Sequence, residues 1–93
     1  MGLPDNVEKY GETAIFTETT VPAKLTSAHD TKHGVWGRLM VLDGALDYII
    51  IGPPESRRRI GQGEYAVVEP AILHWIGIRG PVRFKVEFHR RPE

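Results

Sequence analysis

Glycine and proline interrupt this sequence so often that a long helix has nowhere to form. The chain holds 10 glycines and 7 prolines, and they are spread along its whole length. The longest stretch without either residue covers positions 23–33, and it carries Thr26, Ser27, Asp30 and Thr31. These three residue types favour turns and helix caps over helix interiors. The spacing predicts short β-strands joined by turns, and no helix longer than about two turns.

The hydrophobic pattern between these breaks predicts where the strands lie. Strands are expected over residues 13–20, 35–42, 45–51, 65–69, 74–78 and 82–90, with a more polar strand over 24–32. Asp43-Gly44 is typical of a hairpin turn, and the proline pair in 52–59 predicts a loop. The interpretation is an all-β fold, an antiparallel sandwich or small barrel, built as one domain over residues 1–93.

The composition excludes several classes of protein. The chain has no cysteine, which excludes disulfides, cysteine zinc sites and a thiol nucleophile. Lysine plus arginine and aspartate plus glutamate both number 12, so the net charge is zero, whereas a nucleic-acid binder needs a basic face. No apolar run has the length of a membrane span, and residues 1–10 lack the apolar stretch of a signal peptide. We therefore expect a cytoplasmic protein that binds neither nucleic acid nor membrane.

A homodimer is expected from the same composition. A protein without net charge has weak protection against association. The chain also carries two tryptophans and the apolar run Ile49-Ile50-Ile51, which is more apolar surface than a small barrel easily hides.

Four histidines provide the chemistry-bearing side chains. On a strand, His29 and His33 would point to the same side, His74 would open a later strand after the turn at Pro70, and Glu87 would lie on the last strand. Imidazole and carboxylate together suit zinc, iron, nickel or manganese. The pattern is therefore compatible with a site for one divalent metal ion, although no specific ligand motif is present. The alternative is that these histidines are surface or hydrogen-bonded residues without a ligand role.

Three blocks of the sequence resemble a known family. They are HDTKHGVWGRLMVLDGAL from residue 29, VVEPAILHW from residue 67 and VRFKVEFHR from residue 82. The sequence is similar to the small single-domain cupins grouped as tellurite-resistance-B-like proteins, and the resemblance covers nearly the whole chain. It implies a cupin fold, a double-stranded β-helix or jelly roll, with a metal ion at its mouth.

The resemblance also implies which residues hold the metal. His29 belongs to the first cupin motif and His74 to the second, and His33 lies near the usual place of a second histidine of the first motif. The glutamate ligand expected in that motif falls on Gly37, so Glu87, which matches an acidic position of the family, is the candidate for the missing carboxylate.

The period of two in the last strand makes the role of Glu87 ambiguous. Phe84, Val86 and Phe88 alternate with Glu87, so phenylalanines that fill the barrel would point Glu87 outward. Either the interior is the polar face of this strand, or Glu87 is not a ligand.

Three further residues are candidates for binding a substrate. Lys32 and Arg38 match family positions and could bind an anionic substrate, and Trp36 could shape the ligand pocket. Arg38 could instead pair with a carboxylate such as Glu87, and Trp36 could pack in the core or at a dimer face.

Three functions are consistent with these residues. The first is a metal-binding cupin that binds or transforms a small molecule, with the metal acting as in non-haem dioxygenases. The second is a stress-response protein that binds a metal or an oxyanion such as tellurite without turnover. The third is a dimeric interaction module. The fold alone does not decide among them, because the same fold carries many functions.

Overall fold

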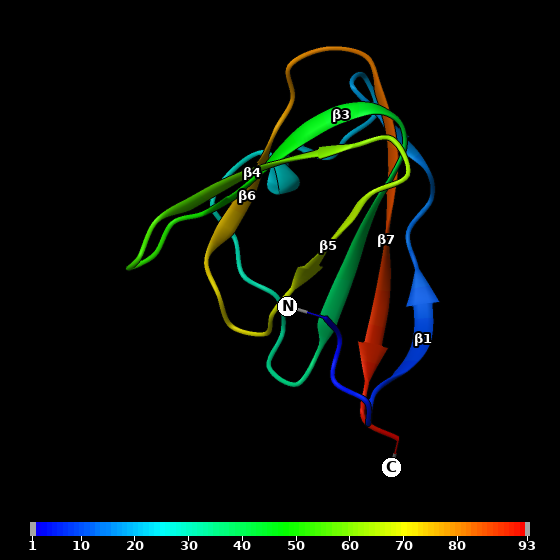
Figure 1. Ribbon diagram of the computed structural model, residues 1–93, viewed down its shortest axis with the longest axis vertical. Coiled ribbons are helices and arrows are strands. Elements are labelled where there is room, and N and C mark those ends of the chain that lie inside the picture. Colours follow the sequence, from blue (N-terminus) through cyan, green and yellow to red (C-terminus); the bar gives the residue numbers. More distant parts are fainter. Residues whose placement is uncertain (1, 93) are drawn as a thin grey trace.

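One long strand organises the whole sheet in the computed structural model, which describes residues 2–92. The strands are β1 (Glu8–Glu12), β2 (Phe16–Thr17), β3 (Trp36–Ile50), β4 (Ser56–Gly61), β5 (Tyr65–Val68), β6 (His74–Gly77) and β7 (Val82–Arg90). The first half of β3 pairs with β5 and β7, and its second half pairs with β4 and β6. β7 also pairs with β1 and β2, and every pairing is antiparallel. Figure 1 shows β3 bending across the molecule, with β7 and β1 on one side and β4 and β6 on the other.

The all-β prediction is confirmed. Among residues 2–92 the one helical element is a single 3-10 turn, η1 (Ala23–Leu25). The last strand spans 82–90 as predicted, and the strands expected near 65–69 and 74–78 are β5 and β6. The Cα radius of gyration is 12.6 Å, close to the value of about 12 Å for one compact domain of this length.

The core lies between the two halves of the sheet. Its most deeply buried side chains are Leu39, Val41, Leu46, Ile60 and Phe84. Inward positions on β3 are odd up to Val41 and even from Leu46, because the register with β7 shifts between Val41 and Asp43. An extra residue in one strand increases its local twist and bends it. This bulge lets one strand serve both halves of the sheet.

The hairpin predicted at Asp43-Gly44 is wrong, because β3 continues through these residues. Gly44 has φ of +75°, which a tight turn and a β-bulge both use, so the dipeptide signal fits either. The chain reverses later, between Ile50 and Ser56, where Gly52 has φ of +93°.

Three other predicted segments also differ from the structure. Of the strand expected over 13–20, only Phe16–Thr17 is regular strand. Residues 24–32 form no regular strand: the hydroxyls of Thr26 and Ser27 donate to the carbonyl of Ala23 and stabilise the η1 turn instead. The loop predicted over 52–59 ends earlier, because β4 begins at Ser56 and its arginines pair along β3. No helix in the described part of the chain is long and apolar enough to cross a membrane.

A buried carboxylate holds the arginines of β4. Asp47 points away from the core, is 3% exposed, and pairs with Arg57 at 3.3 Å, Arg59 at 3.4 Å and Arg79 at 2.6 Å. Burial by itself raises the pKa of Asp47, but Arg79 and Arg59 lower it by more, so the net pKa lies below its usual range. The Asp47 carboxylate therefore holds two arginines of β4 and Arg79, which follows β6, on the outer surface of the sheet.

Asp47→Asn is expected to destabilise the fold by about 1–2 kcal/mol at pH 7. Breaking a buried pair usually costs more, but the arginines here are more than half exposed. Because the pKa of Asp47 is lowered by folding, its contribution exists above the unfolded pKa and disappears as the pH falls through the folded pKa. Urea unfolding of the two proteins should therefore converge below about pH 4. Asp43→Asn, at an exposed position, is the control and should change little; an equal loss in both variants would contradict the role given to Asp47.

Candidate functional site

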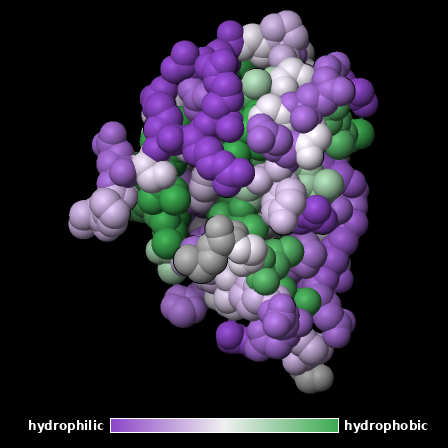
Figure 2. All heavy atoms as spheres, in the orientation of Figure 1, coloured by the Kyte–Doolittle hydropathy of each residue, from purple (hydrophilic) through white to green (hydrophobic). Residues whose placement is uncertain are grey.

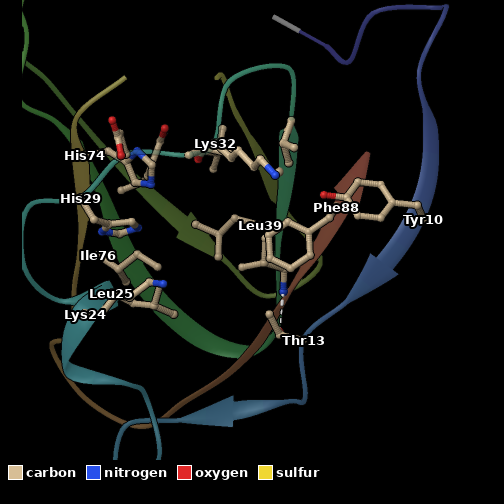
Figure 3. Close-up of a pocket in the computed structure, with 17 residues that line it drawn as sticks. Tyr10, Thr13, Lys24, Leu25, His29, Lys32, Leu39, His74, Ile76 and Phe88 are labelled. Carbon is tan, nitrogen blue, oxygen red and sulfur yellow. Dashed lines mark hydrogen bonds between the residues drawn. The ribbon is translucent and has the colours of Figure 1, made fainter. Parts of the chain in front are cut away.

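A cavity of about 270 Å³ opens beside the segment that joins η1 to β3. One wall is this segment, and the others come from β1, β3, β5, β6 and β7. Its apolar lining includes Leu25, Leu39, Val68, Ile76, Val86 and Phe88. Figure 3 shows the labelled lining side chains around this cavity, with His29 and His74 on one side and Phe88 and Tyr10 on the other. A small apolar cavity with few polar groups is the usual form of a small-molecule site.

The structure brings His29 and His74 together at this cavity. Their backbones form an isolated antiparallel bridge, in which each N–H donates to the other's carbonyl at 3.0 and 2.8 Å. Their ring centroids are 4.3 Å apart with an interplanar angle of 65°. A third hydrogen bond, from Ala71 N–H to the Thr31 carbonyl at 2.9 Å, continues this pairing. The bridge substitutes for the strand expected over 24–32, and it fixes both imidazoles.

The hydrogen bonds of the two rings fix their tautomers. Nδ1 of His29 lies 2.9 Å from the Ser27 carbonyl oxygen, and Nδ1 of His74 lies 2.7 Å from that of Ile72. A carbonyl oxygen only accepts, so each Nδ1 carries the hydrogen and each neutral ring has its lone pair on Nε2. Burial lowers the pKa of His74 and so favours its neutral form near pH 7. This is the arrangement in which protein histidines bind metal ions.

The two other predicted metal ligands lie elsewhere. His33 is exposed in the turn before β3 and does not line the cavity. Glu87 is on the opposite face of β7 from Val86 and Phe88, which do line it. Of the two arrangements considered for this strand, the structure has the phenylalanines inside and the glutamate outside. Within residues 2–92 no group of three or more His, Asp or Glu side chains is placed to hold a metal ion.

Glu87 is the centre of an ion-pair cluster on the outer face. It lies 3.2 Å from Lys9, 3.7 Å from Arg38 and 3.7 Å from Lys85. Burial raises the pKa of Glu87, but Lys9 and the other cations lower it by more, so its net pKa is below the usual range. An ionised carboxylate with these partners joins β1 to β7 and to β3.

Of the three predicted substrate-binding residues, only Lys32 lines the cavity. Arg38 pairs with Glu87 and stacks on the ring of Tyr65, with 4.3 Å from Cζ to the ring centroid. Trp36 is half-buried on the same outer face, where the Arg91 guanidinium lies 5.3 Å from its ring. Both residues are on the face of β3 opposite Gly37 and Leu39, which face the cavity.

Sequence reasoning missed several residues that line the cavity. Lys24, Tyr10 and Asp30 line it, and Gly37 forms part of its wall. The hydroxyl residues at 26 and 27 were the available signal for Lys24, because they favour the turn on which it lies. Tyr48 is buried and also lines the cavity, and burial raises the pKa of its hydroxyl to about 12.

Comparisons with known proteins give one family and several similar solved structures, including the two that follow. The family model of the TehB-like domain matches residues 12–86. The crystal structure of a protein from E. coli strain K12 has a TM-score of 0.88 and 27% identity, covering 100% of this chain and 99% of that one. TehB from Haemophilus influenzae has a TM-score of 0.82 and 21% identity over 94% of this chain, but this chain covers only 32% of TehB. No curated protein matches the sequence.

Proposed function

The chain belongs to the TehB-like domain family, and we propose that it is a cupin-type jelly roll that binds one divalent metal ion through His29 and His74. The observation that supports this is the pair of imidazoles at one cavity, each with its Nδ1 bonded to a carbonyl oxygen. Two neutral imidazoles fixed in this way at one cavity offer two Nε2 lone pairs to a metal ion. The proposal includes a small molecule as the ligand of the adjoining cavity.

The two imidazole nitrogens are donors that suit metal ions of intermediate softness. Two neutral imidazoles suit zinc, iron or nickel, and manganese less well, because manganese prefers oxygen ligands. A two-histidine set leaves the other coordination positions to solvent or to a bound small molecule. An ion held there would supply Lewis-acid or oxygen-binding chemistry beside the cavity. Glu87 is left out of the proposed ligand set, because it faces the other side of β7.

A second candidate function is binding of an oxyanion such as tellurite without turnover. Two lysines at the cavity, Lys24 and Lys32, favour it. The activity of TehB as a whole is not carried over, because this chain spans about a third of that protein.

Zinc binding tests the proposed metal site. Tag-free protein, treated with a chelator and dialysed, is titrated with Zn²⁺ at pH 7.5 in a calorimeter. We expect about one ion per chain in the wild type and no specific binding in the double variant His29→Ala with His74→Ala. His33→Ala is the matched control and should bind as the wild type does. Wild-type affinity in the double variant would refute the site, and the interaction-module hypothesis would then take its place.

We also propose that the chain forms a homodimer. Of the predicted apolar run Ile49-Ile50-Ile51, Ile49 is buried and Ile51 is exposed. Ile51 adjoins another exposed apolar residue, Leu73, through a backbone hydrogen bond of 3.0 Å. Figure 2 shows that hydrophobic residues also reach the surface in the middle of one face, among hydrophilic ones.

Light scattering tests the dimer. We expect twice the chain mass of 10.5 kDa at high micromolar concentration. The double variant Ile51→Glu with Leu73→Glu should lower the dimer fraction, because both side chains would bring charge into the apolar contact. A wild-type mass of one chain at that concentration would refute the proposal.

A further inference from the structure

We propose that the cavity selects a small organic carboxylate with an apolar body, held at its charged end by Lys32, with Lys24 as a second cation in the lining. This inference rests on the proposed function for the identity of the site, and it adds the chemical class of the ligand. The ligand's apolar body would lie against Leu39, Val86 and Phe88, and its carboxylate would lie at the edge formed by the segment 23–35.

The two lysines are free cations on a fixed segment. Within residues 2–92 the lysine ion pairs are made by Lys9 and Lys85, while Lys24 and Lys32 make none. Lys24 lies on the η1 turn. The backbone around Lys32 is held by two hydrogen bonds: Ala71 N–H donates to the Thr31 carbonyl, and Val35 N–H donates to the Lys32 carbonyl. In Figure 3 the Lys32 side chain extends across the cavity toward Phe88. The segment therefore presents positive charge to the cavity from a fixed backbone.

The charges that face the cavity favour one negative charge on the ligand. Besides the two lysines, the ionisable lining residues are Asp30, the two histidines and the two tyrosines. Lysine and aspartate are the charged residue types in this set. Two lysines and one aspartate leave a net charge of one positive unit. No arginine lines this cavity in the described residues, so an anion there would meet the single point charges of lysines.

The walls favour an apolar body on that ligand. Beyond the lysines the lining is mainly aliphatic and aromatic, and an inorganic anion would leave this surface unused. Gly37 adds space, since a Cβ there would lie 3.2 Å from Val68 Cβ and 3.3 Å from Val86 Cγ1, both lining residues. A volume of about 270 Å³, just below the usual range for drug-sized ligands, limits the body to a short chain or a single ring.

A series of simple probes tests the inference without any metal. Chelator-treated protein, ¹⁵N-labelled, is titrated with butanoate, hexanoate, hexan-1-ol and inorganic phosphate, and the amide shifts are followed by NMR. We expect hexanoate to bind more tightly than hexan-1-ol and phosphate, and affinity to rise about fourfold per added methylene. The shifted amides should include those of Gly37, Leu39 and Val86. Phosphate or hexan-1-ol binding as tightly as hexanoate would overturn the inference, and so would the absence of hexanoate binding.

Variants separate the lysine contact from general electrostatics. Lys32→Met keeps an apolar stem and should weaken hexanoate roughly fivefold to tenfold while leaving hexan-1-ol unchanged. Arg83→Met removes the same charge from an exposed position opposite Asp43, outside the cavity lining, and should leave both unchanged. Gly37→Ala should weaken both probes, because it places a methyl group among lining residues. Equal losses in Lys32→Met and Arg83→Met would overturn the inference.

The zinc titration keeps this inference distinct from the proposed metal site. If the wild type binds no zinc but hexanoate binding still depends on Lys32, the metal proposal fails and the carboxylate inference stands. If zinc binds through both histidines but hexanoate does not bind to the chelator-treated protein, the carboxylate inference fails alone.

Discussion

Gly44→Ala is expected to destabilise the protein by about 3 kcal/mol, a large share of the stability of a small domain. Two costs combine at this residue. Its φ of +75° is one that an alanine rarely adopts, which costs about 1 kcal/mol. A Cβ there would also lie 2.1 Å from the carbonyl oxygen of Pro81, so backbone has to move. The Pro81 carbonyl belongs to the backbone, which cannot rotate away as the end of a flexible side chain can. Overpacking of this kind typically costs about 1–3 kcal/mol of stability.

Two other glycines serve as controls in the same urea-unfolding measurement. Gly63 has φ of +80° but no atom within 4 Å of its would-be Cβ, so Gly63→Ala should show the backbone cost alone. Gly80 has neither a positive φ nor a close neighbour, so Gly80→Ala should be neutral or slightly stabilising. If Gly44→Ala lowers the free energy of unfolding no more than Gly63→Ala does, then the Pro81 carbonyl does not crowd the position of Gly44.

Gly44 also shows where sequence patterns stop being informative about the fold. The strand at 82–90 could be predicted with its bounds, because apolar and polar residues alternate along it in the sequence without a break. At Asp43-Gly44 the same local signal, a glycine with positive φ, serves a hairpin turn or a bulge. Which one occurs depends on whether partner strands continue past it, and here β7 reaches Gly44 through Val82 and β4 reaches Ala45 through Gly61. Strand pairings between residues this far apart in sequence cannot be predicted from the Asp43-Gly44 dipeptide.

The candidate site was only partly predictable for a related reason. His29 and His74 were predicted as a pair, and the structure has them adjacent. The alternation of β7 already contained the conflict over Glu87, but the sequence alone did not show which face was interior. The cavity could not be predicted from the sequence, because its shape depends on the η1 turn and on the backbone bridge between His29 and His74. Lys24 therefore went unnoticed, while Arg38 and Trp36, one residue to either side of Gly37, were assigned to a site they do not line.

Zinc affinity is expected to fall steeply as the pH is lowered from 7 to 5, and this is the sharpest property of the proposed metal site. Proton and metal ion compete for the same Nε2 lone pair, so each histidine ligand that is protonated in the free protein costs up to about tenfold per pH unit. Burial lowers the pKa of His74, which delays its protonation to a lower pH than that of an ordinary imidazole. The affinity should therefore level off above about pH 7 and become steepest below about pH 6.

The single-histidine variants should separate one-ligand from two-ligand binding. His29→Ala and His74→Ala are each expected to lose at least about a hundredfold in zinc affinity at pH 7.5, since even residues that only orient a ligand contribute ten- to hundredfold. Any residual binding should change by no more than about tenfold per pH unit, because one imidazole remains. His33→Ala should keep both the wild-type affinity and its pH dependence, since His33 is exposed outside the cavity. An affinity that does not change between pH 5 and 7, or a wild-type affinity in His74→Ala, would mean that the paired imidazoles do not bind the ion. The carbonyl-bonded histidines would then serve to join the segment at residue 29 to β6, which their backbone bridge already does.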